Sequence, residues 1–147
     1  MLFIPKLSVW TEENPTINLQ LETVKSATQT NIPSELSIVL ANGKPNGSIV
    51  HELFPIRYAP ACNKSLYKKW SSLGYNALKE VPLILHQSRP WSWHQWADRV
   101  DIENFDPKQI IQFDSMFGVA RAAQQGMGIA LAGQSLFEIW VTVGFIL

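Results

Sequence analysis

The segment 110–131 constrains the fold of this 147-residue chain most strongly, because it contains two strand-like runs separated by a helix-like run. Residues 110–113 include three large apolar side chains and form a short run typical of a strand that is buried on both faces. Asp114 and Ser115 follow at once, and both residue types cap helix N-termini. The sequence therefore predicts a strand that ends where a helix begins.

The helix and the second strand follow within the same segment. Apolar residues continue from Met116, and Gly126 is the residue type that tolerates the left-handed conformation after a helix end. The run 128–131 then resumes as a buried strand. A crossover of this length returns the chain in its original direction, so we expect two parallel strands with the helix on one face of their sheet. Gly126 and Gly128 follow the helix and therefore do not form a nucleotide-binding fingerprint.

The turn at Asp114 and Ser115 is the first candidate for a binding site. Ligands of open α/β sheets bind outside the carboxyl ends of strands, where helix N-termini present N–H groups and a positive dipole end. Ser115 could contact such a ligand, or it could only cap its own helix.

The rest of the chain shows further helical and strand-like patterns. We expect helices over residues 2–13, 63–70 and 91–100, and strands over residues 17–21, 36–41, 56–58 and 81–85. Ala59 and Pro60 should open a turn. The pattern predicts an α/β chain that begins, unusually, with a helix.

Composition limits the possible functions. The chain is 46% hydrophobic and 16% charged, as in a globular protein, and its formal net charge is zero, which does not favour direct contact with DNA. The single cysteine, Cys62, allows no internal disulfide and suits a reducing compartment, so we expect a cytoplasmic protein. No arrangement of a nucleophile with a base is recognisable, and we expect neither an enzyme nor a bound cofactor.

Two clusters allow a functional and a structural interpretation. Trp91, Trp93 and Trp96 with His94 could form a sugar or base platform or part of a metal site, but the histidines of the chain lack ligand spacing. Packing of a short helix explains the tryptophans better, and we expect no metal. The lysines at 64, 68 and 69 could contact nucleic acid, although a solvated helix face is the simpler interpretation of this pattern.

Several segments together resemble one known family. Phe113-Asp-Ser, Ala123 and the run from Gly126 to Leu131 resemble the effector-domain motif of LysR-type transcriptional regulators, especially the subgroup of the glycine-cleavage activator and the β-lactamase regulator. Other segments agree with the family in order: 2–21, 35–38, 52–56 and 82–85, with Trp93 and Trp96. The resemblance covers roughly residues 2–132.

This resemblance implies a periplasmic-binding-protein-like effector domain built from βαβ units. Residues 1–56 would form part of the first subdomain and residues 57–132 a nearly complete second subdomain, without the helix-turn-helix arm. Residues 133–147 resemble nothing in the family. This segment is apolar but too short to span a membrane, and its β-prone tail from Phe137 should present a pairing edge that lowers solubility.

By the same resemblance, the chain senses a small polar or anionic metabolite in the cleft between the two subdomains. The candidate effector-binding residues are Ser115, Asp114, His86, Gln87, Ala41 and Asn42. Ser115 matches the family pattern best, and strand-end geometry places the others. The full-length regulator would be a homo-oligomer that contacts DNA only through its helix-turn-helix arm. The alternative is a solute-binding or catalytic α/β domain that uses the same cleft without a DNA-binding partner.

The zero net charge predicts that this chain alone binds no duplex DNA sequence-specifically at moderate salt. Specific binders have dissociation constants of about 10⁻⁸ M or tighter, so a gel-shift titration tests the point directly. A sharp complex that resists competitor DNA at sub-micromolar protein would contradict the prediction.

Overall fold

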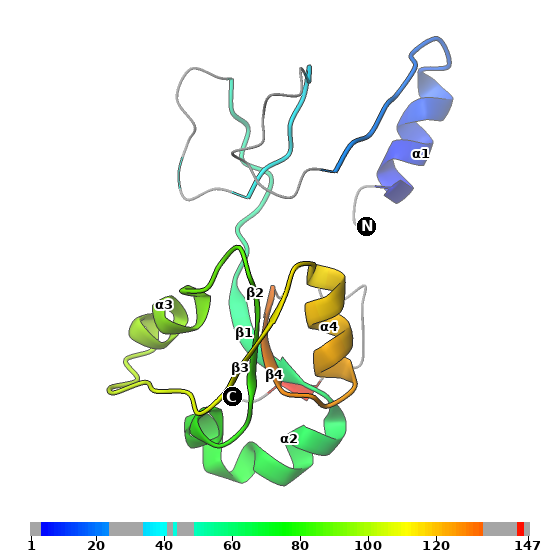
Figure 1. The fold of residues 1–147 in the computed structure, drawn as a ribbon. Helices are drawn as coiled ribbons and strands as arrows, with labels where there is room; N and C mark the ends of the chain where they lie inside the picture. Colours follow the sequence, from blue (N-terminus) through cyan, green and yellow to red (C-terminus); the bar gives the residue numbers. More distant parts are fainter. Residues whose placement is uncertain (1–3, 24–33, 41–42, 44–48, 134–143, 146–147) are drawn as a thin grey trace. The chain divides into compact units, whose positions relative to one another are not determined.

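The computed structural model describes residues 4–23, 34–40, 43, 49–133 and 144–145 of the chain. Contacts within the chain divide it into two units, residues 1–55 and residues 56–147 (Figure 1). Most of the regular secondary structure in the described ranges belongs to the second unit.

The first unit contains helix α1, Ile4–Glu13. The helix ends at Asn14, whose backbone N–H and side-chain Nδ2 donate to the carbonyl of Trp10 at 3.0 and 2.9 Å. Pro15 follows and disfavours a further helical residue at position 14. The helix predicted over residues 2–13 is therefore confirmed over its described part.

The strands predicted over residues 17–21 and 36–41 are wrong for the residues that the structure describes, 17–21 and 36–40. Ile17, Leu19 and Leu21 do alternate with polar residues, but they are 49%, 45% and 61% exposed. A strand needs a second strand to satisfy its backbone groups, and the described part of this unit supplies none. Alternation alone therefore did not produce a strand here.

The second unit is built on one sheet. Its strands are β1, Tyr58–Cys62; β2, Leu83–His86; β3, Ile110–Phe113; β4, Ile129–Gly133; and β5, Gly144–Phe145. They lie in the order β3-β2-β4-β1-β5. β2 runs parallel to both β3 and β4, whereas β1 is antiparallel to β4 and to β5. The parallel βαβ unit predicted from residues 110–131 is confirmed, with β2 lying between its two strands.

Three strand predictions need correction. β3 is an edge strand of this sheet, and its residues are partly exposed rather than buried on both faces. β1 begins at Tyr58 and runs through Ala59 and Pro60, where the sequence predicted a turn. The pairing of Pro60 with Leu131 keeps this stretch extended, which the fixed φ of proline permits. β2 begins at Leu83 instead of residue 81 and includes His86.

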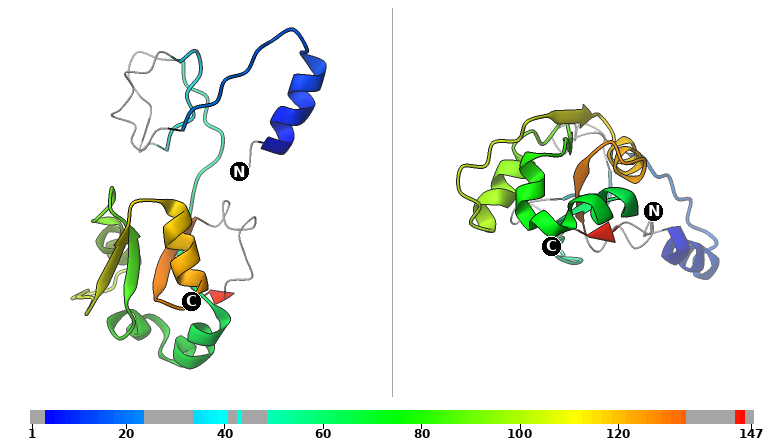
Figure 2. Two further views of the ribbon diagram at one scale, coloured as in Figure 1. Left: turned by 45° about the vertical axis from the view of Figure 1, so that its right-hand side comes forward. Right: turned by 90° about the horizontal axis from the view of Figure 1, so that it is seen from below.

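Helices cover both faces of the sheet. α2, Lys64–Trp70, leads into the 3-10 segment η2, Ser71–Lys79, which the sequence did not predict and which kinks at Gly74. α3 spans Ser92–Arg99 and α4 spans Met116–Gln124, close to the predicted ranges. Figure 2 shows α4 along one face of the sheet and α2 beyond the end at which β1 finishes. The second unit is thus a helix–sheet–helix sandwich.

Alternate residues of the strands pack into two separate apolar layers, one on each face of the sheet. Leu83 and Leu85 of β2 pack with Trp93 and the α2 and η2 side chains, whereas Ile84 packs with Val119 of α4. The α4 layer is rich in alanine, which lets this helix approach the sheet closely. Its alanines are Ala122, Ala123 and Ala130, with Ala61, Ala120 and Ala132 beside them.

The end of the tail is part of the sheet. Gly144 and Phe145 form β5 and pair with Cys62 and Ala61 of β1. The remaining tail residues, 134–143 and 146–147, lie outside the described part of the chain. Residues 144–145 thus pair with β1 within the chain's own sheet, which the sequence did not predict, and the exposed pairing edge and its effect on solubility stay predictions.

Asn63 joins two helices through one side chain. Its Oδ1 accepts from the backbone N–H of Leu66 at 2.9 Å and caps α2, while its Nδ2 donates to the carbonyl of Gln124 at 3.2 Å. Gly126 beside it has a φ of 79° and leaves no room for a Cβ, which would lie 2.7 Å from that Nδ2.

Asn63→Ala should lower the free energy of unfolding by roughly 2 kcal/mol, because a cap contributes about 1 kcal/mol and a hydrogen bond about 0.5–1.5 kcal/mol. Asn63→Asp keeps the capping oxygen and loses only the donor to Gln124, so it should cost about half as much. Urea melts of the three proteins measure both values, and equal costs for the two variants would contradict the double role.

Candidate functional site

The carboxyl ends of β2 and β3 bring the predicted strand-end residues together. His86 pairs with Phe113 in the parallel register, and the N–H of Gln87 donates to the carbonyl of Phe113 at 2.8 Å. The turn at Asp114 and Ser115 continues directly from Phe113. Four candidate residues, His86, Gln87, Asp114 and Ser115, therefore lie on adjacent turns at one edge of the sheet.

Ser115 is the N-cap of α4. Its extended backbone, with a φ of −137°, directs Oγ to accept from the N–H of Gly118 at 3.1 Å. The capping role predicted from sequence is confirmed. A hydroxyl that accepts one hydrogen bond still has a hydrogen to donate, so capping does not exclude a contact with a ligand. A Cβ at position 118 would lie 2.9 Å from the Phe113 ring, so glycine lets the helix start close to β3.

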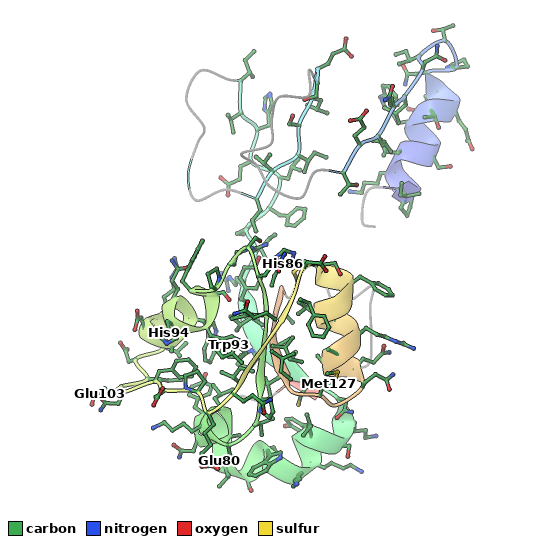
Figure 3. All side chains as sticks on the ribbon, in the orientation of Figure 1. Glu80, His86, Trp93, His94, Glu103 and Met127 are labelled. Carbon is green, nitrogen blue, oxygen red and sulfur yellow. The ribbon has the colours of Figure 1, made fainter. Side chains whose placement is uncertain are left out.

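His86 is held by the turn that follows it. Its Nδ1 receives the backbone N–H of Ser88 at 3.1 Å and lies 2.7 Å from the Ser88 hydroxyl. Because a backbone N–H can only donate, Nδ1 acts as an acceptor and the ring hydrogen lies on Nε2. Figure 3 shows His86 at the end of the sheet where α4 begins. The imidazole thus presents an N–H donor at this edge.

Arg89 and Tyr58 lie at the same edge, and sequence reasoning selected neither of them. Arg89 Nη1 donates to the Tyr58 hydroxyl at 2.9 Å, and its Cζ lies 5.9 Å from the centre of the Tyr58 ring. Tyr58 starts β1, which is antiparallel to β4, so it lies beside the carboxyl ends of the parallel strands. A charged residue in the turn after a buried strand was a signal that could have identified Arg89.

Ala41 and Asn42, the candidates from the first unit, lie outside the described residues. Their part in a binding site stays a prediction. Every candidate that the structure does describe comes from the second unit.

Two members of the tryptophan and histidine cluster, Trp93 and Trp96, pack in the core. Trp93 is fully buried and its indole N–H donates to the carbonyl of Ile84 at 3.0 Å, while Trp96 meets Trp93 and Tyr75 edge to face. The packing interpretation is confirmed for Trp93 and Trp96. Trp91, in contrast, is 52% exposed.

His94 lines an open cavity of about 510 Å³ with the acidic loop between α3 and β3. The acidic side chains there are Asp98, Asp101 and Glu103. Among the described residues, no group of three or more histidine, cysteine, aspartate or glutamate side chains could hold a metal ion. This cavity therefore offers an acidic surface without a built metal centre.

The basic face of α2 is exposed at Lys64, Lys68 and Lys69. Lys69 Nζ lies 5.1 Å from the centre of the neighbouring Trp70 ring. The three lysines gain no further basic partner on this helix, as a solvated helix face would show.

The sheet is mixed, with β2, β3 and β4 parallel and β1 and β5 joined by antiparallel pairing, and helices cover both of its faces. Polar turns at the carboxyl ends of β2 and β3 are where α/β domains of this class bind ligands. The family model described as the LysR substrate binding domain matches residues 1–144. The chain belongs to this family, whose effector domains have a periplasmic-binding-protein-like fold and serve transcription regulation.

Solved structures show the same fold. The effector domain of the transcriptional regulator AmpR of Pseudomonas aeruginosa is similar with a TM-score of 0.69 and 19% identity, over 98% of this chain and 74% of that chain. The AmpR effector binding domain from Citrobacter freundii gives 0.60 and 19%, over 98% and 76%. A Citrobacter freundii effector binding domain with three amino acid substitutions gives 0.60 and 20%, over 98% and 77%. No curated protein sequence matches the chain.

These comparisons assign the chain to a regulatory family rather than an enzymatic one. LysR-type effector domains bind small-molecule effectors, and the regulators that contain them usually oligomerise. No helix within the described ranges is both long and apolar enough to cross a membrane.

Cys62 lies at the far end of β1 from the candidate site, and it is fully buried. Burial disfavours the thiolate and raises the pKa of the Cys62 thiol from 9.0 to about 11. We therefore expect the folded chain to resist alkylation by iodoacetamide at pH 8, where the urea-unfolded chain should react fully. The unfolded thiol ionises near pH 9, whereas the folded thiol ionises only near pH 11. The folded state therefore keeps its full stability below pH 9 and loses stability as the pH rises from 9 to 11. Mass spectrometry of the adducts measures the reaction, and equal rates for folded and unfolded chain would contradict the prediction.

Proposed function

We propose that this chain is the effector-sensing domain of a LysR-type transcriptional regulator, and that a small polar or anionic metabolite binds at the carboxyl edge of its sheet. In this proposal the edge is the second subdomain's side of the inter-subdomain cleft. Ala41 and Asn42 would contribute from the first subdomain.

One observation carries the proposal. The parallel pairing of β2 with β3 places His86 opposite Phe113, so that the His86-Gln87 turn adjoins the capped start of α4. Ligands of this fold class bind at such an edge. The pairing thus unites residues that lie 27 positions apart in the sequence at a point where the fold is suited to receive a ligand.

Each residue at this edge has a chemical role that its geometry permits. Ser115 donates its hydroxyl hydrogen while it caps α4, and the helix start adds a positive dipole end. His86 donates from Nε2, and the exposed Gln87 side chain can both donate and accept. Asp114 accepts hydrogen bonds from polar groups of the effector. This mixture suits a small molecule with several polar groups.

Binding would act through differential affinity. An effector that binds one arrangement of the two subdomains more tightly shifts the population toward that arrangement. In the full-length homo-oligomer this shift would change how the helix-turn-helix arms meet DNA. We place the subdomain boundary near residue 56. Within the family, the glycine-cleavage-activator subgroup is the best match by motif.

A thermal-shift screen of the chain against small polar and anionic metabolites should identify a stabilising effector, since ligand at 100 times its dissociation constant adds about 2.7 kcal/mol. Ser115→Ala should then weaken the affinity for this effector by roughly 10- to 100-fold, because a hydrogen bond to a charged group contributes about 1.5–3 kcal/mol. Calorimetric titration measures the affinity.

Asn63→Ala is the matched control, because it also removes an N-cap but lies at the opposite end of β1. Both variants should lose stability in denaturant melts, and only Ser115→Ala should lose affinity. Unchanged affinity in Ser115→Ala would mean that Ser115 is only a cap. A screen in which no metabolite stabilises the chain would count against the proposed function itself.

A further inference from the structure

The geometry points to a carboxylate-binding subsite formed by Arg89 and His86, the two ends of the turn that follows β2. This inference rests on the proposed function and names the chemical group of the effector that the edge recognises. The turn closes on itself through the N–H of Arg89, which donates to the carbonyl of His86 at 2.9 Å. The two side chains thus start from one compact turn.

Arg89 is positioned before any ligand arrives. Tyr58 holds its guanidinium by the hydroxyl contact at 2.9 Å and by the ring face at 5.9 Å. Tyr58 is held in turn, because the indole N–H of Trp96 donates to its carbonyl at 3.1 Å. A guanidinium has five N–H groups, and the Tyr58 hydroxyl uses one of them. The others stay available in a fork that matches a carboxylate.

Arg89 forms no ion pair within the described part of the chain. The one ion pair found there joins Lys108 and Glu80, which lie away from this edge. Arg89 is only partly exposed, so its charge is incompletely solvated. A partly buried guanidinium without a carboxylate partner favours an anionic ligand.

His86 adds a second donor with a fixed direction. Ser88 occupies Nδ1 with its backbone N–H, so the hydrogen lies on Nε2 and the imidazole cannot present an acceptor there. The Ser88 hydroxyl lies 2.7 Å from the same Nδ1 and further fixes the ring. Both side chains of the turn therefore present donors, and neither presents an acceptor at these atoms.

The number of charges favours a carboxylate over a phosphate. Arg89 supplies one full positive charge on this edge, and the exposed Asp114 supplies a negative charge on the neighbouring turn. A phosphate dianion would bring one more negative charge than a carboxylate close to Asp114, and the single guanidinium can pair with only one charge. The group that this subsite binds is therefore a carboxylate, and phosphate serves as the comparison ligand in the test.

The test is an NMR titration of the ¹⁵N-labelled full chain with acetate, with acetamide as its neutral analogue, at constant ionic strength. Acetate should shift the Arg89 Nε–H and His86 ring signals along a saturable curve, and acetamide should not. Inorganic phosphate should bind more weakly than acetate. Arg89→Gln should weaken acetate binding at least about tenfold. The acetate affinity of Arg89→Lys should lie between those of Arg89→Gln and the unchanged chain, since lysine keeps the positive charge but lacks the paired N–H groups of the guanidinium.

Arg99→Gln is the matched control, because it removes an exposed arginine of the same charge from the last turn of α3. It should bind acetate within about twofold of the unchanged chain, as a distant exposed charge is screened. His86→Gln should retain most of the binding by keeping an amide donor, whereas His86→Phe should lose it. The Trp96 indole N–H signal reports whether Tyr58 keeps its place in each variant.

Four outcomes would overturn the inference. Shifts that rise linearly without saturation would show that acetate has no site, and equal weakening in Arg89→Gln and Arg99→Gln would show a general charge effect. If a metabolite from the screen binds Arg89→Gln as well as the unchanged chain, the carboxylate subsite is wrong while the effector-sensing function stands. If Arg89→Gln loses stability and keeps acetate affinity, Arg89 only supports Tyr58.

Discussion

The parallel pairing of β2 with both β3 and β4 is the interaction on which the second unit depends. β2 is four residues long, yet it supplies buried side chains to both faces of the sheet: Leu83 and Leu85 to one and Ile84 to the other. The two layers can form only when this register is kept, because a shift by one residue would exchange the faces. Close packing of α4 on its alanine-rich face depends on the same register.

That register also builds the candidate site. With His86 opposite Phe113, the turns after β2 and β3 end at one edge, and the cap of α4 lies beside the donor turn of residues 86–89. Tyr58 reaches the edge from the antiparallel strand β1 and orders Arg89. The binding chemistry that we propose is therefore a consequence of strand pairing.

Local sequence determined much of this unit. The βαβ segment 110–131, the capping role of Ser115, the helix after Asn63 and the helix near Trp93 were all predictable. Their signals are short-range, because a cap, a glycine after a helix and an apolar period each act within a few residues. The same reasoning placed His86 and Gln87 at a strand end and so found most of the described edge.

Tertiary structure decided the rest, because the deciding contacts join residues far apart in the chain. Residues 17–21 alternate like a strand but lack a described partner, whereas β1 passes through Pro60 because β4 pairs with it. The hydrogen bond between Arg89 and Tyr58 joins residues 31 positions apart in the sequence, and no local sequence pattern predicts it. The sequence by itself determined where helices and buried strands begin and which turns are polar. Only folding decided which strands pair, since backbone hydrogen bonds between strands depend on a partner that local sequence does not specify.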